Sequence, residues 1–152
     1  YWIPKDAHTE DDSTWIPNSF ITRKLNYIKA NNILVIADSC YSGTMTRGLN
    51  INDKITQKPQ NFYLNTKSRI AISSGGNKPV LDSGGGSHSI FAGMLINKLK
   101  SNSKPIISSQ LYSAIADKVR EASSKKNFIQ IPTIGPLIES GHEEPDFVFI
   151  PK

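Results

Sequence analysis

Cysteine is nearly absent from the sequence, since Cys40 is the only one among 152 residues. A disulfide within the chain is therefore impossible, and a metal site built from several cysteines is excluded. A lone cysteine is typical of a reducing compartment, where the side chain is either a buried apolar group or a reactive thiol. We therefore expect a cytoplasmic location, and both roles are open for Cys40.

Long hydrophobic runs are also lacking. The longest aliphatic run, Ile-Leu-Val-Ile-Ala, occupies residues 33–37, whereas a helix that spans a bilayer needs about 20 apolar residues. No membrane partner is therefore expected. With 38% hydrophobic and 20% charged residues, the chain is predicted to form a single globular domain over residues 1–152.

Negative charge is outweighed by positive charge, with 13 Asp and Glu against 18 Lys and Arg and a net charge of +5. Such an excess is compatible with a polyanionic partner. However, no aromatic residues are interleaved with the lysines of the C-terminal half, as they are in proteins that bind single strands. These lysines are Lys100, Lys104, Lys118, Lys125 and Lys126. The charge therefore favours solubility, and nucleic acid is not the expected partner.

Short aliphatic runs predict three strands. Residues 33–37 are expected to form a strand buried on both faces, as in parallel sheets, and residues 69–73 form a second, weaker run. Residues 147–150, Phe-Val-Phe-Ile, predict a final short strand. The first two strands are separated by a long polar loop over residues 41–59, and loops of that length are often functional.

Apolar residues at helical spacing predict three helices. They cover residues 18–31, residues 90–99 and a segment that begins at Ser108 or Ser109. A side-chain oxygen of Asn18 or Ser19 is expected to cap the first helix. Because strands and helices alternate along the chain, we expect an α/β layered fold.

Cys40 stands three residues beyond the end of the strand predicted over residues 33–37. Ligands of open α/β sheets bind beyond the carboxyl ends of strands, so this position favours a chemical role. Gly43 allows the backbone to turn sharply behind the cysteine, and the small Ser39 and Ser42 leave the sulfur accessible. A nucleophilic cysteine also needs a base, usually histidine, and N–H groups that hold an oxyanion.

No histidine in the sequence is an evident base. His8, His88 and His142 do not follow a hydrophobic strand, so each is interpreted as a solvated surface residue. Other cysteine chemistries fit less well, because Arg47 falls one position too far from Cys40 for the phosphate loop of tyrosine phosphatases. A thioredoxin-like motif needs a second cysteine.

The segment at residues 38–43, Asp-Ser-Cys-Tyr-Ser-Gly, resembles the nucleophile segment of caspase-like cysteine peptidases, in particular the metacaspase-like and bacterial branches. Those proteins carry Asp-x-Cys-x-Ser-Gly directly after an aliphatic strand. The metacaspase branch usually has histidine where this chain has Tyr41. The residues that match are Asp38, Cys40, Ser42 and Gly43.

Four other segments resemble the same family, namely residues 1–7, 69–76, 87–99 and 141–151. The resemblance implies a caspase-like α/β/α sandwich with a mostly parallel central sheet, whose N-terminal strands are missing from this chain. It also implies that the catalytic histidine lies upstream of Tyr1. Residues 1–4, Tyr-Trp-Ile-Pro, are accordingly interpreted as the end of a strand, and the N-terminal remainder of the domain is an expected partner.

The resemblance further implies a substrate preference. Asp38 matches the aspartate that lines the first specificity pocket of metacaspase-like enzymes, and its carboxylate is expected to attract Arg or Lys of the substrate. The alternative is that Asp38 caps local backbone N–H groups. Asp82 is expected to add negative charge to the pocket, and Ser73 is expected to contact the substrate backbone.

No cofactor is expected. The acidic run at residues 10–12, Glu-Asp-Asp, offers oxygen ligands for calcium, which some metacaspases require. Three adjacent acids do not define a calcium cage, so hydrated loop charge is the preferred interpretation.

The sequence thus predicts a cysteine endopeptidase that uses Cys40 as its nucleophile and cleaves a protein or peptide after Arg or Lys. The alternative, given that no base is evident, is a caspase-like scaffold that binds a partner without catalysis.

Overall fold

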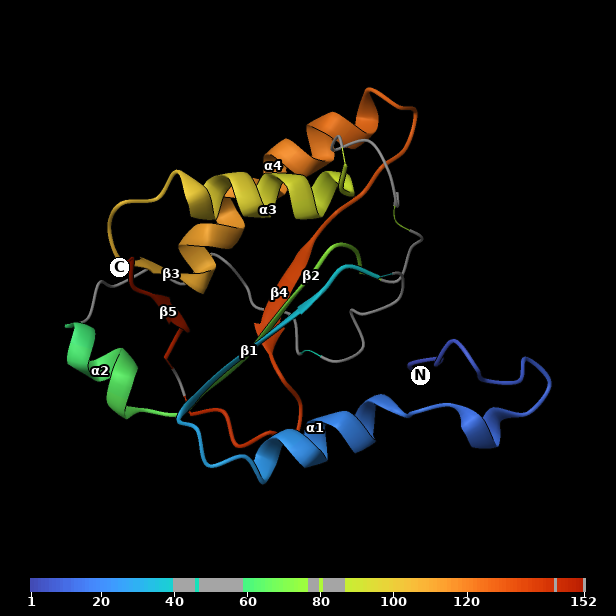
Figure 1. The fold of residues 1–152 in the computed structure, drawn as a ribbon. Helices are drawn as coiled ribbons and strands as arrows, with labels where there is room; N and C mark the ends of the chain where they lie inside the picture. The colour runs from blue at the N-terminus through green and yellow to red at the C-terminus, as the bar shows by residue number, and fades with distance from the viewer. Residues whose placement is uncertain (40–45, 47–58, 77–79, 81–86, 144, 152) are drawn as a thin grey trace.

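The fold is organised around a small mixed sheet of three strands (Figure 1). The computed structural model describes residues 1–39, 46, 59–76, 80, 87–143 and 145–151. Within them, the strand order is β1 (Asn32–Ala37), β2 (Ser68–Ser73) and β4 (Thr133–Pro136). β1 is parallel to β2, whereas β2 is antiparallel to β4. The chain is therefore a mixed α/β protein.

Helices connect these strands, and a second sheet of two short strands lies beside them. The helical elements are η1 (Asp12–Thr14), α1 (Asn18–Asn26), α2 (Gln60–Asn65), α3 (Ile90–Lys100) and α4 (Ser108–Ser124). The second sheet pairs β3 (Ile106–Ile107) with β5 (Val148–Phe149) in antiparallel orientation.

Helices pack on both faces of the three-stranded sheet. The larger core joins buried side chains of β2 and β4, such as Ile72 and Ile134, to apolar side chains of α3 and α4, such as Phe91 and Ile115. On the other face, Ala71 and Leu137 pack against partly buried side chains that include those of α1. Figure 1 accordingly shows α3 and α4 together on one side of the sheet and α1 on the opposite side.

The predicted strands β1, β2 and β5 and the helix α3 are confirmed, but the burial expected for β1 is wrong. All six residues of β2 are buried, whereas in β1 only Ala37 is, and 42% of Ile36 is exposed. The physical reason is position, because β1 is the outer strand of the sheet formed by the described residues and β2 is its central strand.

Residues 1–4, interpreted from the sequence as the end of a strand, join neither sheet formed by the described residues. Trp2 pairs with Ile16 through an isolated antiparallel bridge whose N–H···O distances are 2.7 and 2.9 Å. The centroids of the Tyr1 and Trp15 rings lie 5.7 Å apart in an edge-to-face arrangement, which is a second contact between the two ends of residues 1–16.

The first helix begins and ends differently from the prediction. Asn18 already lies inside α1, and Pro17 precedes it with no side-chain cap. The helix ends at Asn26, so Ile28 lies outside it and is 46% exposed.

The sequence did not predict α2, β3 or β4. The Gly135-Pro136 pair concealed β4, and proline is tolerated in a strand mainly at a sheet edge.

Arg69, the second residue of β2, is almost completely buried and ties β2 to the segment that precedes β1. It is 2% exposed, and its guanidinium donates to four backbone carbonyls. Nη2 donates to the Ile28 and Ala30 oxygens at 3.3 and 2.6 Å, and Nη1 donates to those of Asn31 and Ser68. Burial lowers the pKa of Arg69, and the nearby Glu143 partly offsets this shift.

We expect Arg69→Met to lower the free energy of unfolding by about 2–4 kcal/mol, because four backbone carbonyls lose the donors that the buried guanidinium supplies. Urea denaturation measures the change. The matched control is Arg120→Met, since Arg120 is exposed and its ion pair is with the exposed Asp117 of the same helix. The control should change the free energy by less than about 1 kcal/mol, and equal effects of the two variants would contradict the assigned role.

The N-terminus of α4 is held by Asp146 from the C-terminal segment. Its Oδ1 accepts from the Ser108 hydroxyl at 2.7 Å and from the Ser109 N–H at 3.2 Å, and its Oδ2 accepts from the Ser109 hydroxyl at 2.6 Å. The Ser108 N–H also donates to the Phe147 carbonyl at 2.8 Å. A carboxylate is favourable here because the helix N-terminus carries partial positive charge.

We expect Asp146→Ala to lower the free energy of unfolding by about 1–3 kcal/mol, because charge-assisted bonds to a helix N-terminus are lost. Asp117→Ala, an exposed substitution in the same helix, should change it by less than about 0.5 kcal/mol. Thermal and urea denaturation of both variants measure the difference. Indistinguishable stabilities would show that Asp146 does not stabilise α4.

Candidate functional site

The candidate site lies at the carboxyl ends of the parallel strands β1 and β2. Their register pairs Ala37 with Ser73, so both strands end at the same level of the sheet. Asp38 and Ser39 follow β1, and Ser74 follows β2. The structure thus places two of the predicted site residues, Asp38 and Ser73, at one edge.

The other two predicted site residues, Cys40 and Asp82, lie outside the described residues. The backbone that leads to Cys40 is described up to Ser39. Two hydrogen bonds from Ser74, the residue that follows β2, hold it in place. The Ser74 N–H donates to the Ala37 carbonyl at 2.9 Å, and the fully buried Ser74 hydroxyl donates to the Ser39 carbonyl at 3.4 Å. The direction in which the chain leaves β1 is therefore set by these two bonds.

Ser74 is held in turn by Gln130, from the connection between α4 and β4. The Gln130 side-chain amide donates to the Ser74 carbonyl at 2.9 Å, and Gln130 is 1% exposed. The Gln130 N–H donates to the hydroxyl of Ser123 at 3.1 Å. This buried chain of polar contacts joins α4 to the edge of the sheet that carries the candidate site.

The Ser73 hydroxyl forms hydrogen bonds within the protein. Its Oγ donates to the Gly75 carbonyl at 2.8 Å and lies 2.7 Å from the Thr133 hydroxyl. Because the single Ser73 hydroxyl hydrogen goes to Gly75, the Thr133 hydroxyl is the donor of the second bond. With 4% of Ser73 exposed, these contacts shape the loop after β2.

Asp38 is exposed, and its carboxylate is held by the helix α3. Oδ2 accepts from the Ser89 hydroxyl at 2.5 Å, and the same hydroxyl accepts from the Ala92 N–H at 2.9 Å. Ser89 is 8% exposed and is the N-cap of α3. The sequence signal for Ser89 was a serine directly before an apolar helical pattern, but this signal does not reveal the contact with Asp38.

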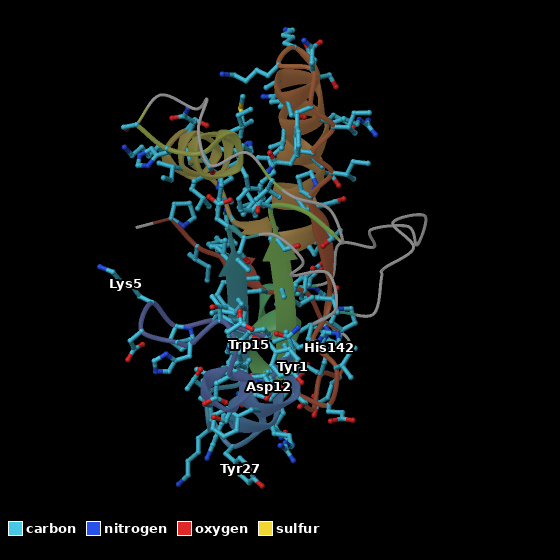
Figure 2. The ribbon with its side chains drawn as sticks, turned by 90° about the vertical axis from the view of Figure 1, so that its right-hand side faces the viewer. Tyr1, Lys5, Asp12, Trp15, Tyr27 and His142 are labelled. Atoms are coloured by element: carbon cyan, nitrogen blue, oxygen red, sulfur yellow. The ribbon has the colours of Figure 1, made fainter. Side chains whose placement is uncertain are left out.

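The three histidines occupy different environments. His8 and His88 are exposed, as expected. His142 was expected at the solvated surface, but it is half-buried, and its Nδ1 accepts from the Arg69 N–H at 3.0 Å. It therefore lies at the amino end of β2, on the side of α1 (Figure 2). A six-residue strand is about 17 Å long, so His142 is far from the candidate site.

The acidic run at residues 10–12 is exposed, and the Asp11 side chain bonds a backbone N–H group. The Asp11 carboxylate accepts from the Ser13 N–H at 3.0 Å as the N-cap of η1. Hydrogen bonding to the Ser13 side chain, and then to its backbone N–H, lowers the pKa of Asp11. Among the described residues, no group of three or more His, Cys, Asp and Glu side chains is placed to hold a metal ion.

Comparisons of the chain with protein-family models, with curated proteins and with solved structures find no match. In the part of the chain that the structure describes, no helix has the length and apolar character needed to cross a bilayer. The functional conclusion therefore depends on the residues at the carboxyl ends of β1 and β2.

Proposed function

We propose that the chain is part of a caspase-like cysteine endopeptidase that cleaves after Arg or Lys, with Cys40 as the nucleophile. The observation that carries the proposal is the position of Asp38-x-Cys40 directly after β1, which runs parallel to the buried strand β2. Strand ends of this kind are where α/β proteins place their reactive groups. The proposed thiol must remain reduced, so we also propose a cytoplasmic location.

The proposed reaction uses no cofactor. A histidine takes the proton of the Cys40 thiol, and the thiolate attacks the scissile carbonyl of the substrate. The Cys40 N–H and an N–H beside that histidine hold the resulting oxyanion. The histidine then gives its proton to the leaving amine, and water hydrolyses the acyl-enzyme.

We propose that the histidine is supplied by sequence upstream of Tyr1. Of the described histidines, His142 lies at the amino end of β2, His8 lies in the N-terminal segment, and the exposed His88 follows no strand. Among the described residues, β2 is the only strand paired with β1, and 42% of Ile36 is exposed there. A further strand beside β1, with the histidine at its carboxyl end, would complete the caspase-like sandwich.

The proposed preference for Arg or Lys rests on Asp38. Asp38 is exposed, and among the described residues Ser89 is the side chain that orients its carboxylate, so it is accessible to a cationic substrate group. A guanidinium pairs with a carboxylate through two parallel hydrogen bonds, which is why arginine suits such a site. We propose that Asp82 adds charge nearby, whereas the buried Ser73 acts through the shape of its loop.

The second candidate function is a caspase-like scaffold that binds a partner without catalysis. It is favoured by where the described histidines lie: His142 contacts the backbone at the far end of β2, His8 lies in the N-terminal segment, and the exposed His88 follows no strand. In this case the chain would keep the sheet and the strand-end loops but would lack a base.

We expect the full-length protein to hydrolyse fluorogenic peptides that end in Arg or Lys and to leave matched peptides that end in Asp intact. Cys40→Ala should abolish hydrolysis, because the nucleophile is lost. Asp38→Asn should lower kcat/KM for these peptides by about 10- to 100-fold, since a charged hydrogen bond contributes about 1.5–3 kcal/mol. Initial rates at varied peptide concentration measure both effects.

The matched control is His88→Ala, which removes an exposed histidine and should retain the wild-type rate. Loss of activity in this variant would assign the base to His88 and contradict an upstream histidine. Activity that survives Cys40→Ala would overturn the proposed nucleophile. A wild-type protein that cleaves none of these peptides would support the scaffold.

A further inference from the structure

One side chain, Ser89, connects the carboxylate of Asp38 to the rigid part of the protein. The two residues are 51 positions apart in the sequence, and the distance from Ser89 Oγ to Asp38 Oδ2 is 2.5 Å. Hydrogen bonds from a hydroxyl to a carboxylate are short and strong because the acceptor is charged. Ser89 therefore determines where Oδ2 lies.

The Ser89 hydroxyl fills two roles at once. A hydroxyl has one hydrogen and two acceptor lone pairs. Its hydrogen goes to Asp38, and it accepts the Ala92 N–H at 2.9 Å as the N-cap of α3. The next two residues, Ile90 and Phe91, are 1% and 0% exposed, so α3 is anchored in the core directly behind Ser89.

Asp38 itself is exposed and follows the end of β1. Among the described residues, Ser89 is the only side chain shown to bond its carboxylate. Without that bond, the side chain would sample several rotamers, and a ligand would have to order it at an entropic cost.

We propose that Ser89 is a positioning residue that holds Asp38 in the orientation that receives the basic side chain of the substrate. This inference rests on the proposed peptidase function and deepens it. The Ser89 hydroxyl bonds the Asp38 carboxylate and the Ala92 N–H, so we place its effect on the binding of the basic residue. Its removal should raise KM for Arg and Lys peptides and leave kcat nearly unchanged.

The test uses Ser89→Gly and Ser89→Thr in the full-length protein. Glycine is tolerated at an N-cap at a cost of only a few tenths of a kcal/mol, so the first variant removes the hydroxyl while α3 remains capped by water. We expect KM for an Arg peptide to rise about three- to tenfold, with kcat within about twofold of the wild type. Ser89→Thr retains the hydroxyl and should restore the wild-type KM.

A double-mutant cycle with Asp38→Asn separates positioning from structure. If Ser89 acts only through Asp38, adding Ser89→Gly to Asp38→Asn should change KM by less than about twofold. Asp146→Ala, which weakens the N-terminus of α4 and does not contact Asp38, is the control for lost stability and should leave KM unchanged.

Two failures are distinguishable. If the wild type cleaves Arg and Lys peptides but Ser89→Gly keeps the wild-type KM, or if the two substitutions are additive, the positioning role is overturned and the peptidase stands. If the wild type cleaves no such peptide, the proposed function fails and the positioning role fails with it.

Discussion

The buried guanidinium of Arg69 is the interaction on which the arrangement of the sheet depends. Its donors bind carbonyls of the segment between α1 and β1, so they fix where β1 begins relative to β2. The register that follows pairs Asn32 with Ser68 and ends with Ala37 opposite Ser73. Because both strands have six residues, the constraint at their amino ends also sets the level of the candidate site at their carboxyl ends.

Polar contacts between distant segments complete that edge. Ser74 reaches across to the end of β1, Gln130 holds Ser74, and Ser89 reaches from α3 to Asp38. Buried hydroxyl and amide groups are costly unless paired, so each satisfied contact favours one geometry over its alternatives. The loops that leave β1 and β2 therefore start from well-defined positions.

The pattern of apolar residues along the sequence predicted the strands and helices that depend mainly on neighbouring residues. The aliphatic run of β2 and the apolar spacing of α3 were sufficient. Asp38 and Ser73 were named as site residues by the resemblance, and the register of β1 and β2 places them at one edge. β4 was missed because a Gly-Pro pair conceals it and its pairing with β2 is distant in sequence. The Asp146 bonds at α4 and the Ser89 bond to Asp38 span 37–38 and 51 residues, so only the folded chain reveals them.

The outer edge of β1 has a consequence for how the chain behaves in solution. In the part that the structure describes, that edge has no strand beside it, and the adjoining Ile36 is exposed. Unpaired backbone N–H and C=O groups next to an apolar side chain form a template for intermolecular β-pairing. The same edge that would accept a further strand of the domain is thus the place where two copies of the chain would aggregate.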